Sequence, residues 1–350
     1  MVNPIPYDVD GELPLTLRPR GDDPSSKDLA SLCRWLEANG PWVQEHLTRH
    51  GALRFSGFDV KDARDFERLA RAVDDELKNE YLGTSPRDAL TEYVFNASEL
   101  PGFYPIPQHC EMSFCADPPR RVFFYCLEAP AQGSGETPLC DFRAVWRELE
   151  PDLRQRFVEG GLRIVRNYSG PGEGDDRDPL RLKRWSEMFL TTDRAQVEAK
   201  CAEQGFEPSW QHGDGLRLVH TQPVYRDHPV TGERVWHNHS TTFHLSTAVG
   251  EYARIAKLRP GERHEGLLRM ARSLEATQRQ KSAEEQSMHC TYLDGREIPD
   301  EDMGVVRDVV WRHMAIEPWL RGDIVAIDNH SVSHGRLPYE GARHVAVCWA

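Results

Sequence analysis

The sequence predicts a single domain over residues 1–350, mainly β in structure, with a β-barrel-like core and helices packed around it. Three observations point to this fold class. Short apolar segments typical of strands occur near both ends of the chain, a long and mostly helical insertion separates them, and the chain has no internal repeat or low-complexity tail. A chain of 350 residues can form one large domain or two smaller ones, and this pattern favours one.

The first third of the chain alternates helices with short strands. Apolar residues at helical spacing predict a helix over 29–50, which the Asn-Gly-Pro sequence at 39–41 divides in two. A strand is expected over 52–58 and an amphipathic helix over 61–77. Short strands then continue to the apolar run at 122–127, which is the strongest strand signal in this part of the chain.

A helical and loop insertion is expected at about 141–215, and a helical segment at about 260–314. Within the first, residues 170–181 are rich in Gly, Asp, Arg and Pro, which predicts an exposed loop and a candidate lid over a site. Strands are expected at 324–328 and 344–349. Further strands are expected at 216–224 and 234–238, and helices at 141–158, 193–205, 265–287 and 299–314.

Composition narrows the class of protein. The formal net charge of −13 argues against nucleic-acid binding, which requires a basic surface. The longest apolar run is far shorter than the roughly 20 residues of a membrane helix, and the first 20 residues contain no apolar run typical of a signal peptide. We therefore expect a cytoplasmic enzyme with no membrane partner. The eight cysteines form no Cys-x-x-Cys pair, so we expect them to be reduced and buried.

Two segments far apart in the chain can supply ligands to one metal ion. His109 and Glu111 lie in the first, and His330 and His334 in the second. Two imidazoles and one carboxylate on one face of an ion leave its other positions open. Iron(II) bound in this way can accept a bidentate co-substrate and then O2.

The spacing of His109 and Glu111 carries no information by itself. Composition predicts about two His-x-Asp/Glu pairs, and the chain contains two, the other being His212 and Asp214. Context separates them, because glycines around the second pair predict a turn, whereas the first pair precedes an apolar strand. Residues two apart in an extended chain project from one face, so His109 and Glu111 are expected to point together into the barrel. His237, His239 and His244 form a rival cluster, but no acidic residue accompanies them.

A set of longer motifs is specific in combination. It comprises GALRFSGF at 51–58, YLGTSPR at 81–87, HCEMSF at 109–114, GETP at 135–138, VWHN at 235–238 with FH at 243–244, and DNHSVSHGR at 328–336 with PYEG at 338–341 and Arg343. In these motifs nearly the whole chain resembles the taurine/2-oxoglutarate dioxygenase superfamily (clavaminate synthase-like), and within it the branch of syringomycin-biosynthesis-type amino-acid hydroxylases.

The resemblance implies a double-stranded β-helix (jelly-roll) core that uses Fe(2+), 2-oxoglutarate and O2. The iron ligands of the family correspond to His109, Glu111 and His334, which selects His334 over His330. The family arginine that pairs with the far carboxylate of 2-oxoglutarate corresponds to Arg343, and a threonine that helps to hold this co-substrate corresponds to Thr137. A buried Arg343 also requires an anion on physical grounds, and a protein carboxylate is the alternative partner.

Two departures from the family pattern bear on the reaction. Val347 stands where some members have a second arginine four places after Arg343, which puts a sulfonate substrate in doubt. The acidic ligand Glu111 is present, which argues against the halogenase variants because they need that position empty for chloride.

The sequence therefore predicts hydroxylation of an unactivated C–H bond in an amino acid or related small polar metabolite of natural-product metabolism. A desaturase or cyclase of the same superfamily, or a cupin-type metalloenzyme that does not use 2-oxoglutarate, are the alternatives. Whether the substrate is free or tethered to a carrier protein, and whether the chain forms a homo-oligomer, stay open. Candidate substrate-binding residues are Asn96, Glu99, Arg166 and Arg336.

Overall fold

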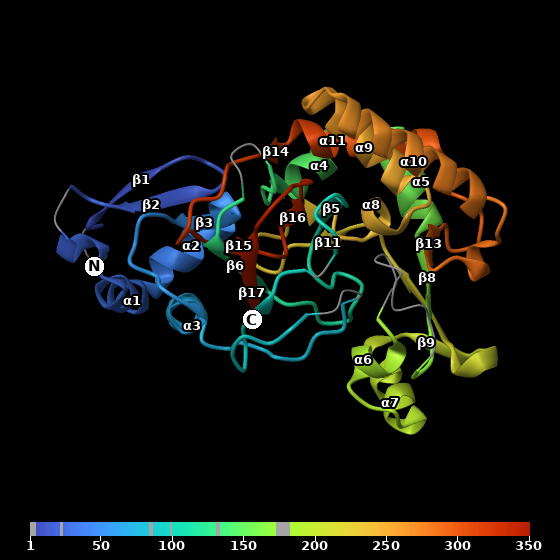
Figure 1. Cartoon of the computed structure of the whole chain (residues 1–350), viewed down its shortest axis with the longest axis horizontal. Coiled ribbons are helices and arrows are strands. Elements are labelled where there is room, and N and C mark those ends of the chain that lie inside the picture. Colours follow the sequence, from blue (N-terminus) through green and yellow to red (C-terminus); the bar gives the residue numbers. More distant parts are fainter. Residues whose placement is uncertain (1–4, 22–23, 84–86, 99, 131–133, 173–182) are drawn as a thin grey trace.

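The computed structural model describes residues 5–21, 24–83, 87–98, 100–130, 134–172 and 183–350. Within these ranges the strands form one mixed sheet and three antiparallel ones, the smallest a two-stranded ribbon, and helices lie at both ends of the molecule (Figure 1). The largest sheet contains, in spatial order, β1 (Tyr7–Asp10), β2 (Leu15–Pro19), β3 (Ala52–Phe55), β15 (Ile324–Asp328), β6 (Arg121–Glu128), β17 (His344–Trp349) and β4 (Phe95–Asn96).

Two four-stranded sheets and a short ribbon complete the β structure. The second sheet contains β14 (Met314–Ala315), β7 (Leu139–Asp141), β16 (Val332–Arg336) and β5 (Ile106–His109). The third contains β13 (Met288–Thr291), β8 (Leu162–Tyr168), β10 (Leu216–Gln222) and β9 (Glu207–Trp210), and the ribbon pairs β11 (Arg226–Asp227) with β12 (Arg234–Val235).

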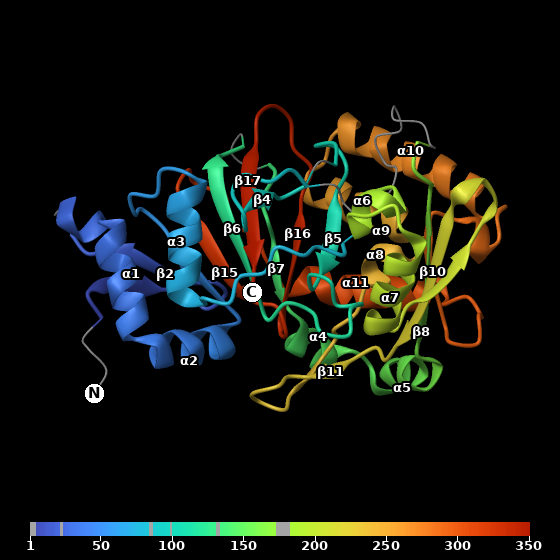
Figure 2. The same ribbon diagram turned by 90° about the horizontal axis from the view of Figure 1, so that it is seen from below.

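The helices fall into an N-terminal group and a group inserted between the strands (Figure 2). The first group is α1 (Leu29–Ala38), α2 (Gly40–His50) and α3 (Ala63–Val73). The second is α4 (Phe142–Glu148), α5 (Pro151–Gly160), α6 (Trp185–Phe189), α7 (Arg194–Gln204), α8 (Ser240–Phe243), α9 (Thr247–Leu258), α10 (Glu262–Gln278) and α11 (Asp300–Arg312). The first group lies at one end of the molecule, beside β2 and β15, and most of the second lies at the other end, around β8 and β10 (Figure 2).

The central strands of the largest sheet are buried on both faces. In β6, Val122 and Phe124 belong to one hydrophobic cluster, and Phe123 and Tyr125 belong to another. The second cluster also contains the apolar faces of α1, α2 and α3, while the first fills the space toward the other sheets. Because successive residues of a strand point to opposite faces, a strand covered on both sides needs the continuous apolar run found at 122–127.

The N-terminal predictions are confirmed. The helix expected over 29–50 is divided between α1 and α2 at Asn39, and Pro41 occupies the first turn of α2, where its missing N–H costs nothing. Asp28 caps α1 by accepting a hydrogen bond from the Ser31 N–H at 2.8 Å. The strand over 52–58 and the helix over 61–77 both form, each shorter than expected, as β3 and α3.

Other predictions need correction. The helix expected over 141–158 is two helices, because Pro151 starts α5 and disfavours helical backbone in the residue before it. The helix expected to reach 287 ends at Gln278, and only Arg234–Val235 of the strand expected over 234–238 is extended. Strand β8 was not predicted, since Arg163 and Arg166 break its apolar run.

Part of the expected lid over 170–181 lies outside the described residues, as do residues 131–133 of the loop before Gly135. All eight cysteines are buried and free of disulfides, as predicted. Within the described ranges, no helix has the length and apolar character needed to cross a membrane.

Candidate metal centre and its cavity

The antiparallel pairing of β16 with β5 brings two imidazoles together. His334 lies directly opposite His109 in the register of these strands, and their ring centroids are 4.5 Å apart. On its other edge β16 pairs with β7, so that both neighbours hold the strand. Residues opposite each other in an antiparallel pair project on the same side of the sheet, which gives the two rings a common direction.

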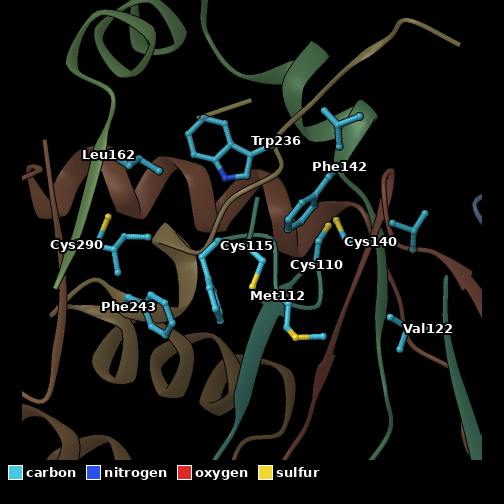
Figure 3. Close-up of a cluster of buried hydrophobic side chains, with 14 of the residues drawn as sticks. Cys110, Met112, Cys115, Val122, Cys140, Phe142, Leu162, Trp236, Phe243 and Cys290 are labelled. Carbon is cyan, nitrogen blue, oxygen red and sulfur yellow. The ribbon is translucent and has the colours of Figure 1, made fainter. Parts of the chain in front are cut away.

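Glu111 reaches this pair from a turn, which corrects the expectation of one extended strand. Strand β5 ends at His109, and Met112 adopts a left-handed φ of 50° as the chain turns. The carboxylate nevertheless lies beside the imidazoles, with Glu111 Oε2 3.6 Å from His334 Nε2. One ligand atom from each of the three residues falls within 4.8 Å of the other two. Cys110, between the ligands, is buried in the hydrophobic core (Figure 3).

Asn329 fixes the backbone of Glu111. Its side-chain oxygen accepts a hydrogen bond from the Glu111 N–H at 2.7 Å, and its amide nitrogen donates to the Glu111 carbonyl at 2.9 Å. The same nitrogen donates to the carbonyl of Pro119 at 2.7 Å, and the Asn329 side chain is fully buried. A buried amide with these partners satisfied locks the turn on which the acidic ligand stands.

His330 takes no part in the cluster. Its ring lies 6.1 Å from that of His228 and 6.3 Å from that of His237. His228 Nε2 in turn lies 2.8 Å from a carboxylate oxygen of the buried Asp328. The geometry therefore brings His334, and not His330, to His109 and Glu111.

The protonation states suit a cation. Burial and the neighbouring His334 lower the pKa of His109 to about 4, so this imidazole is neutral at neutral pH. Its Nδ1 lies 2.9 Å from the Pro107 carbonyl, which can only accept, so Nδ1 carries the hydrogen and Nε2 keeps its lone pair. Burial alone would raise the pKa of Glu111, but the guanidinium of Arg87 and the two imidazoles hold it well below its usual range.

The cluster opens into a cavity of about 140 Å³. Aromatic and cationic side chains make up much of its wall, and Glu111 is the single acid among the described residues that line it. The described lining residues are Tyr81, Gly83, Arg87, Ala97, Ser98, Leu100, Tyr104, Ile106, Pro107, His109, Glu111, Phe114, Phe124, Thr137, His239, Thr242, Phe243, Met288, His334, Gly335, Arg336 and Arg343.

Arg343 and Thr137 lie together in the same cavity. Arg343 donates from Nε to the Gly135 carbonyl at 2.7 Å and from Nη2 to the Thr137 hydroxyl at 3.1 Å. The indole N–H of Trp319 also donates to this hydroxyl, at 3.1 Å, which leaves the Thr137 hydrogen to donate elsewhere. Burial and the nearby Arg336 lower the pKa of Arg343 to about 10, and no carboxylate among the described residues forms an ion pair with it.

Of the other expected substrate residues, only Arg336 is among the described residues that line the cavity. Arg336 lines it, but its guanidinium donates to the carbonyls of Leu100, Pro101 and Tyr104. Asn96 lies on β4, outside the lining set, with its side-chain oxygen 2.8 Å from His344 Nε2. Glu99 lies outside the described residues.

Arg166 is fully buried behind the cavity wall. Its guanidinium stacks 4.3 Å from the ring of Phe114, which lines the cavity, and 4.7 Å from that of Phe206. All three of its guanidinium nitrogens lack a hydrogen-bond partner among the described residues. Arg166 thus supports Phe114 from behind and does not itself reach the cavity surface.

The rival histidines are dispersed. Nε2 of His237 lies 3.2 Å from the Asn329 carbonyl, His239 lies 2.6 Å from the Ser113 hydroxyl, and His244 lies 3.0 Å from the Ile298 carbonyl. In the part of the chain that the structure describes, His109, Glu111 and His334 are the one group of three with metal-ligand geometry. His239 does line the cavity.

Sequence reasoning missed Arg87 and Lys183. Arg87 donates to Glu111 Oε2 at 3.0 Å and to the Tyr81 hydroxyl at 2.9 Å. The ammonium of Lys183 lies 4.7 Å from the Tyr81 ring centre. The motif at 81–87 indicated the family without assigning Arg87 a role, and nothing around Lys183 in the sequence distinguishes it from a surface lysine.

Comparison with known proteins places this site in context. The chain matches the family model described as "Taurine catabolism dioxygenase TauD, TfdA family" over residues 13–349. It is 28% identical over 305 residues to "Dapdiamide synthesis protein DdaC" of Enterobacter agglomerans, covering 87% of this chain and 83% of that protein. It is also 28% identical over 310 residues to "Clavaminate synthase-like protein At3g21360" of Arabidopsis thaliana, covering 87% and 82%.

Two solved structures share the fold. PvcB of Pseudomonas aeruginosa superposes with a TM-score of 0.54 at 13% identity, covering 100% of this chain and 93% of that one. PvcB is described as an Fe, alpha-ketoglutarate dependent oxygenase from an isonitrile synthetic pathway. AAD-2 in complex with Mn(II) and N-oxalylglycine superposes with a TM-score of 0.51 at 12% identity, covering 99% and 97%.

Replacing Gly335 by Ala should disturb the metal centre through sterics alone. A Cβ at this position would stand 2.6 Å from the Ile106 carbonyl oxygen, so β16 and β5 must move apart and separate His334 from His109. We expect a loss of about 1–3 kcal/mol in the free energy of unfolding, measured by chemical denaturation, and roughly tenfold or more weaker binding of a divalent metal, measured by anaerobic titration.

Gly304→Ala is the matched control, because an added Cβ in this helical position meets no atom within 4 Å. It should leave metal binding unchanged and stabilise the fold by about 0.5–1 kcal/mol. Wild-type stability and metal affinity in Gly335→Ala would show that the close approach of the two strands does not control the site.

Proposed function

Because the chain belongs to the taurine catabolism dioxygenase TauD, TfdA family, we propose that it hydroxylates an unactivated C–H bond of an amino acid or closely related small polar metabolite in specialised metabolism. The family establishes the broader statement, which is that the protein is an Fe- and 2-oxoglutarate-dependent dioxygenase acting on a small molecule. The sites, the substrate class and the reaction outcome are our proposal.

One observation carries it. The cluster of His109, Glu111 and His334 opens into the same cavity as the anion-binding pair of Arg343 and Thr137. A metal and a dicarboxylate co-substrate can therefore bind side by side in one small space.

The donor set fits iron(II). Two imidazoles and one carboxylate are the ligands of non-haem iron oxygenases, and three protein ligands leave positions for a co-substrate and O2. We assign His109, Glu111 and His334 as these ligands. Iron with 2-oxoglutarate supplies the oxidising chemistry: O2 gives one oxygen atom to succinate, with release of CO2, and the other to the C–H bond, which becomes an alcohol.

We assign Arg343 to the carboxylate of 2-oxoglutarate that lies away from the metal. Its side chain is half-buried and pairs with no carboxylate among the described residues, and an arginine in that state favours an anion. Thr137 accepts from Arg343 and keeps its hydroxyl hydrogen for the same anion. Glu136, the neighbour of Thr137, pairs instead with Arg259 at 2.6 Å, so it does not compete.

The chain's own residues bind, orient and exclude water. The bond from His109 Nδ1 to Pro107 holds that imidazole in one tautomer, and Asn329 holds the turn that carries Glu111. Phe114 and Phe124 contribute apolar surface to the cavity wall. We propose that Arg336 shapes the wall by binding the chain at 100–104 and that Arg166 supports Phe114. We keep Asn96 and Glu99 as proposed substrate-binding residues.

The finer description of fold and pathway is also proposed. We infer a jelly-roll core, because the sheets carrying β6, β15, β17 and β5, β7, β16 enclose the cavity and the fold matches PvcB. We treat the chain as one oxygenase domain, since the family match spans residues 13–349. The 28% identity to a protein named for dapdiamide synthesis supports a role in specialised metabolism.

The metal assignment is tested by anaerobic titration of Fe(II) into single Ala variants. His109→Ala, Glu111→Ala and His334→Ala should each lose most iron binding, because each removes one of three ligands. His330→Ala is the matched control and should bind iron like the wild type. If His330→Ala loses iron while His334→Ala retains it, the distal ligand is wrongly assigned.

Arg343→Ala should weaken 2-oxoglutarate binding. Removing one partner of a buried charge pair typically costs about 2–5 kcal/mol, which corresponds to roughly 30-fold or more in the dissociation constant. Iron binding should persist, since Arg343 touches none of the three ligands. Arg263→Ala, which removes an exposed arginine paired with Glu340, serves as control. A normal affinity for 2-oxoglutarate in Arg343→Ala would remove this residue from the co-substrate site.

The reaction is tested by mass spectrometry under 18O2 with iron, ascorbate and 2-oxoglutarate, after a screen for succinate release against amino acids. We expect a product that carries one labelled oxygen. A product two hydrogens lighter, or one carrying chlorine, would refute hydroxylation and leave the family assignment intact.

A further inference from the structure

The cavity wall carries more cationic side chains than are needed to bind one molecule of 2-oxoglutarate. Three arginines line it, whereas Glu111 is the single acid among its described lining residues. Our proposed function assigns Arg343 to 2-oxoglutarate. Arg336 donates to three backbone carbonyls, so that among the described residues only its Nε–H lacks a partner, whereas Arg87 has unpaired donors on two of its nitrogens.

Arg87 is buried and only partly satisfied. Its side chain is 7% exposed, and Nη2 makes both of its hydrogen bonds, to Glu111 and to Tyr81. The N–H of Nε and both hydrogens of Nη1 have no acceptor among the described residues. Unpaired buried donors of a charged group lower the stability of the fold, and an anion bound at this edge of the guanidinium would pair them.

A second cation lies close to Arg87. The centre of the Arg87 guanidinium is 4.2 Å from the Tyr81 ring centre, and the Lys183 ammonium is 4.7 Å from it. Lys183 is buried, and no described carboxylate forms an ion pair with it. Two buried cations packed on one aromatic ring repel each other, and an anion beside them relieves that repulsion.

We propose that Arg87 binds a carboxylate of the organic substrate at the cavity wall next to Glu111, with Lys183 strengthening the positive potential from behind Tyr81. This inference rests on the proposed function and adds a substrate class to it. The enzyme should accept carboxylic acids and discriminate against their neutral amides. An amino group of the substrate would meet neutral acceptors, because Glu111 is the one described acid on the wall and is taken by the metal.

The planar guanidinium favours a carboxylate over other anions of similar charge. Arginine presents its donors in a fork that matches two carboxylate oxygens, whereas a lysine would offer a single point of contact. Because the same guanidinium also donates to Glu111, a bound carboxylate would lie at a fixed distance from the metal ligands. Arg87 is therefore a specificity residue that touches both the substrate and a ligand of the metal.

The test uses the full-length protein loaded anaerobically with Fe(II) and 2-oxoglutarate, whose complex absorbs in the visible. Formation of this band tests the proposed function separately and first. We then add amino acids, 2-hydroxy acids and dicarboxylic acids, each paired with its primary carboxamide, and measure dissociation constants from the perturbation of the band. The wild type should prefer at least one acid over its own amide by roughly 30-fold or more.

Substitutions then assign the preference to Arg87. The preference for the acid over its amide should fall to about threefold or less in Arg87→Gln and should be partly kept in Arg87→Lys. In Lys183→Met this preference should fall by a smaller factor than in Arg87→Gln. Lys183→Met does not touch Glu111 and so tests the proposal even if Arg87→Gln no longer holds metal. Lys200→Gln, which removes one charge from a surface ion pair with Glu80, is the control for net charge and should keep the full preference.

Several outcomes would overturn the inference. Equal binding of acid and amide by the wild type is one, and a panel in which no carboxylate perturbs the band counts equally against it. If Arg87→Gln binds metal and keeps the full preference for the acid, another residue recognises the substrate. If Arg87→Gln does not bind metal, a full preference in both Arg87→Lys and Lys183→Met leads to the same conclusion.

Discussion

The pairing of β16 with β5 is the constraint on which the rest of the site depends. It places His334 opposite His109, although the two residues are far apart in the chain, and a register shift of one residue would turn one imidazole to the other face of the sheet. Gly335 allows the close approach, since the Ile106 carbonyl occupies the space of a Cβ. The register of these two strands therefore determines whether the two imidazoles can meet at all.

The turn at 328–330 links this register to the acidic ligand. Asn329 pairs with the backbone of Glu111 across 218 residues of sequence, and the residue before it, Asp328, is held by Arg121 at 2.8 Å. Strand β16 begins only three residues after Asn329, so one short segment carries the distal histidine and also positions the acid. This explains physically why the motif at 328–336 was so informative in the sequence.

Sequence reasoning selected the three residues that the structure brings together, and also Arg343, by combining the family resemblance with local context. His109 and Glu111 precede an apolar strand, and Arg343 precedes another. The turn that carries Glu111 was not predictable, because nothing in the sequence indicates that Met112 adopts a left-handed backbone conformation. The burial of Arg87 and Lys183 around Tyr81 depends on tertiary packing, which a single sequence does not encode as a period or a spacing. Strand β8 was also missed, because an arginine such as Arg166 is usually exposed and here is buried within the strand.

The charges around Glu111 suggest how one arginine can serve two states of the enzyme. A buried carboxylate without a cation would be strongly destabilised, and Arg87 provides that partner whether or not a metal is present. If Glu111 is a metal ligand, as we propose, its carboxylate would already be ionised when the metal binds. A bound metal would share the charge of Glu111 and would leave more of the positive potential of Arg87 for its unpaired edge. Metal binding and recognition of an anionic substrate would then be coupled through a single guanidinium.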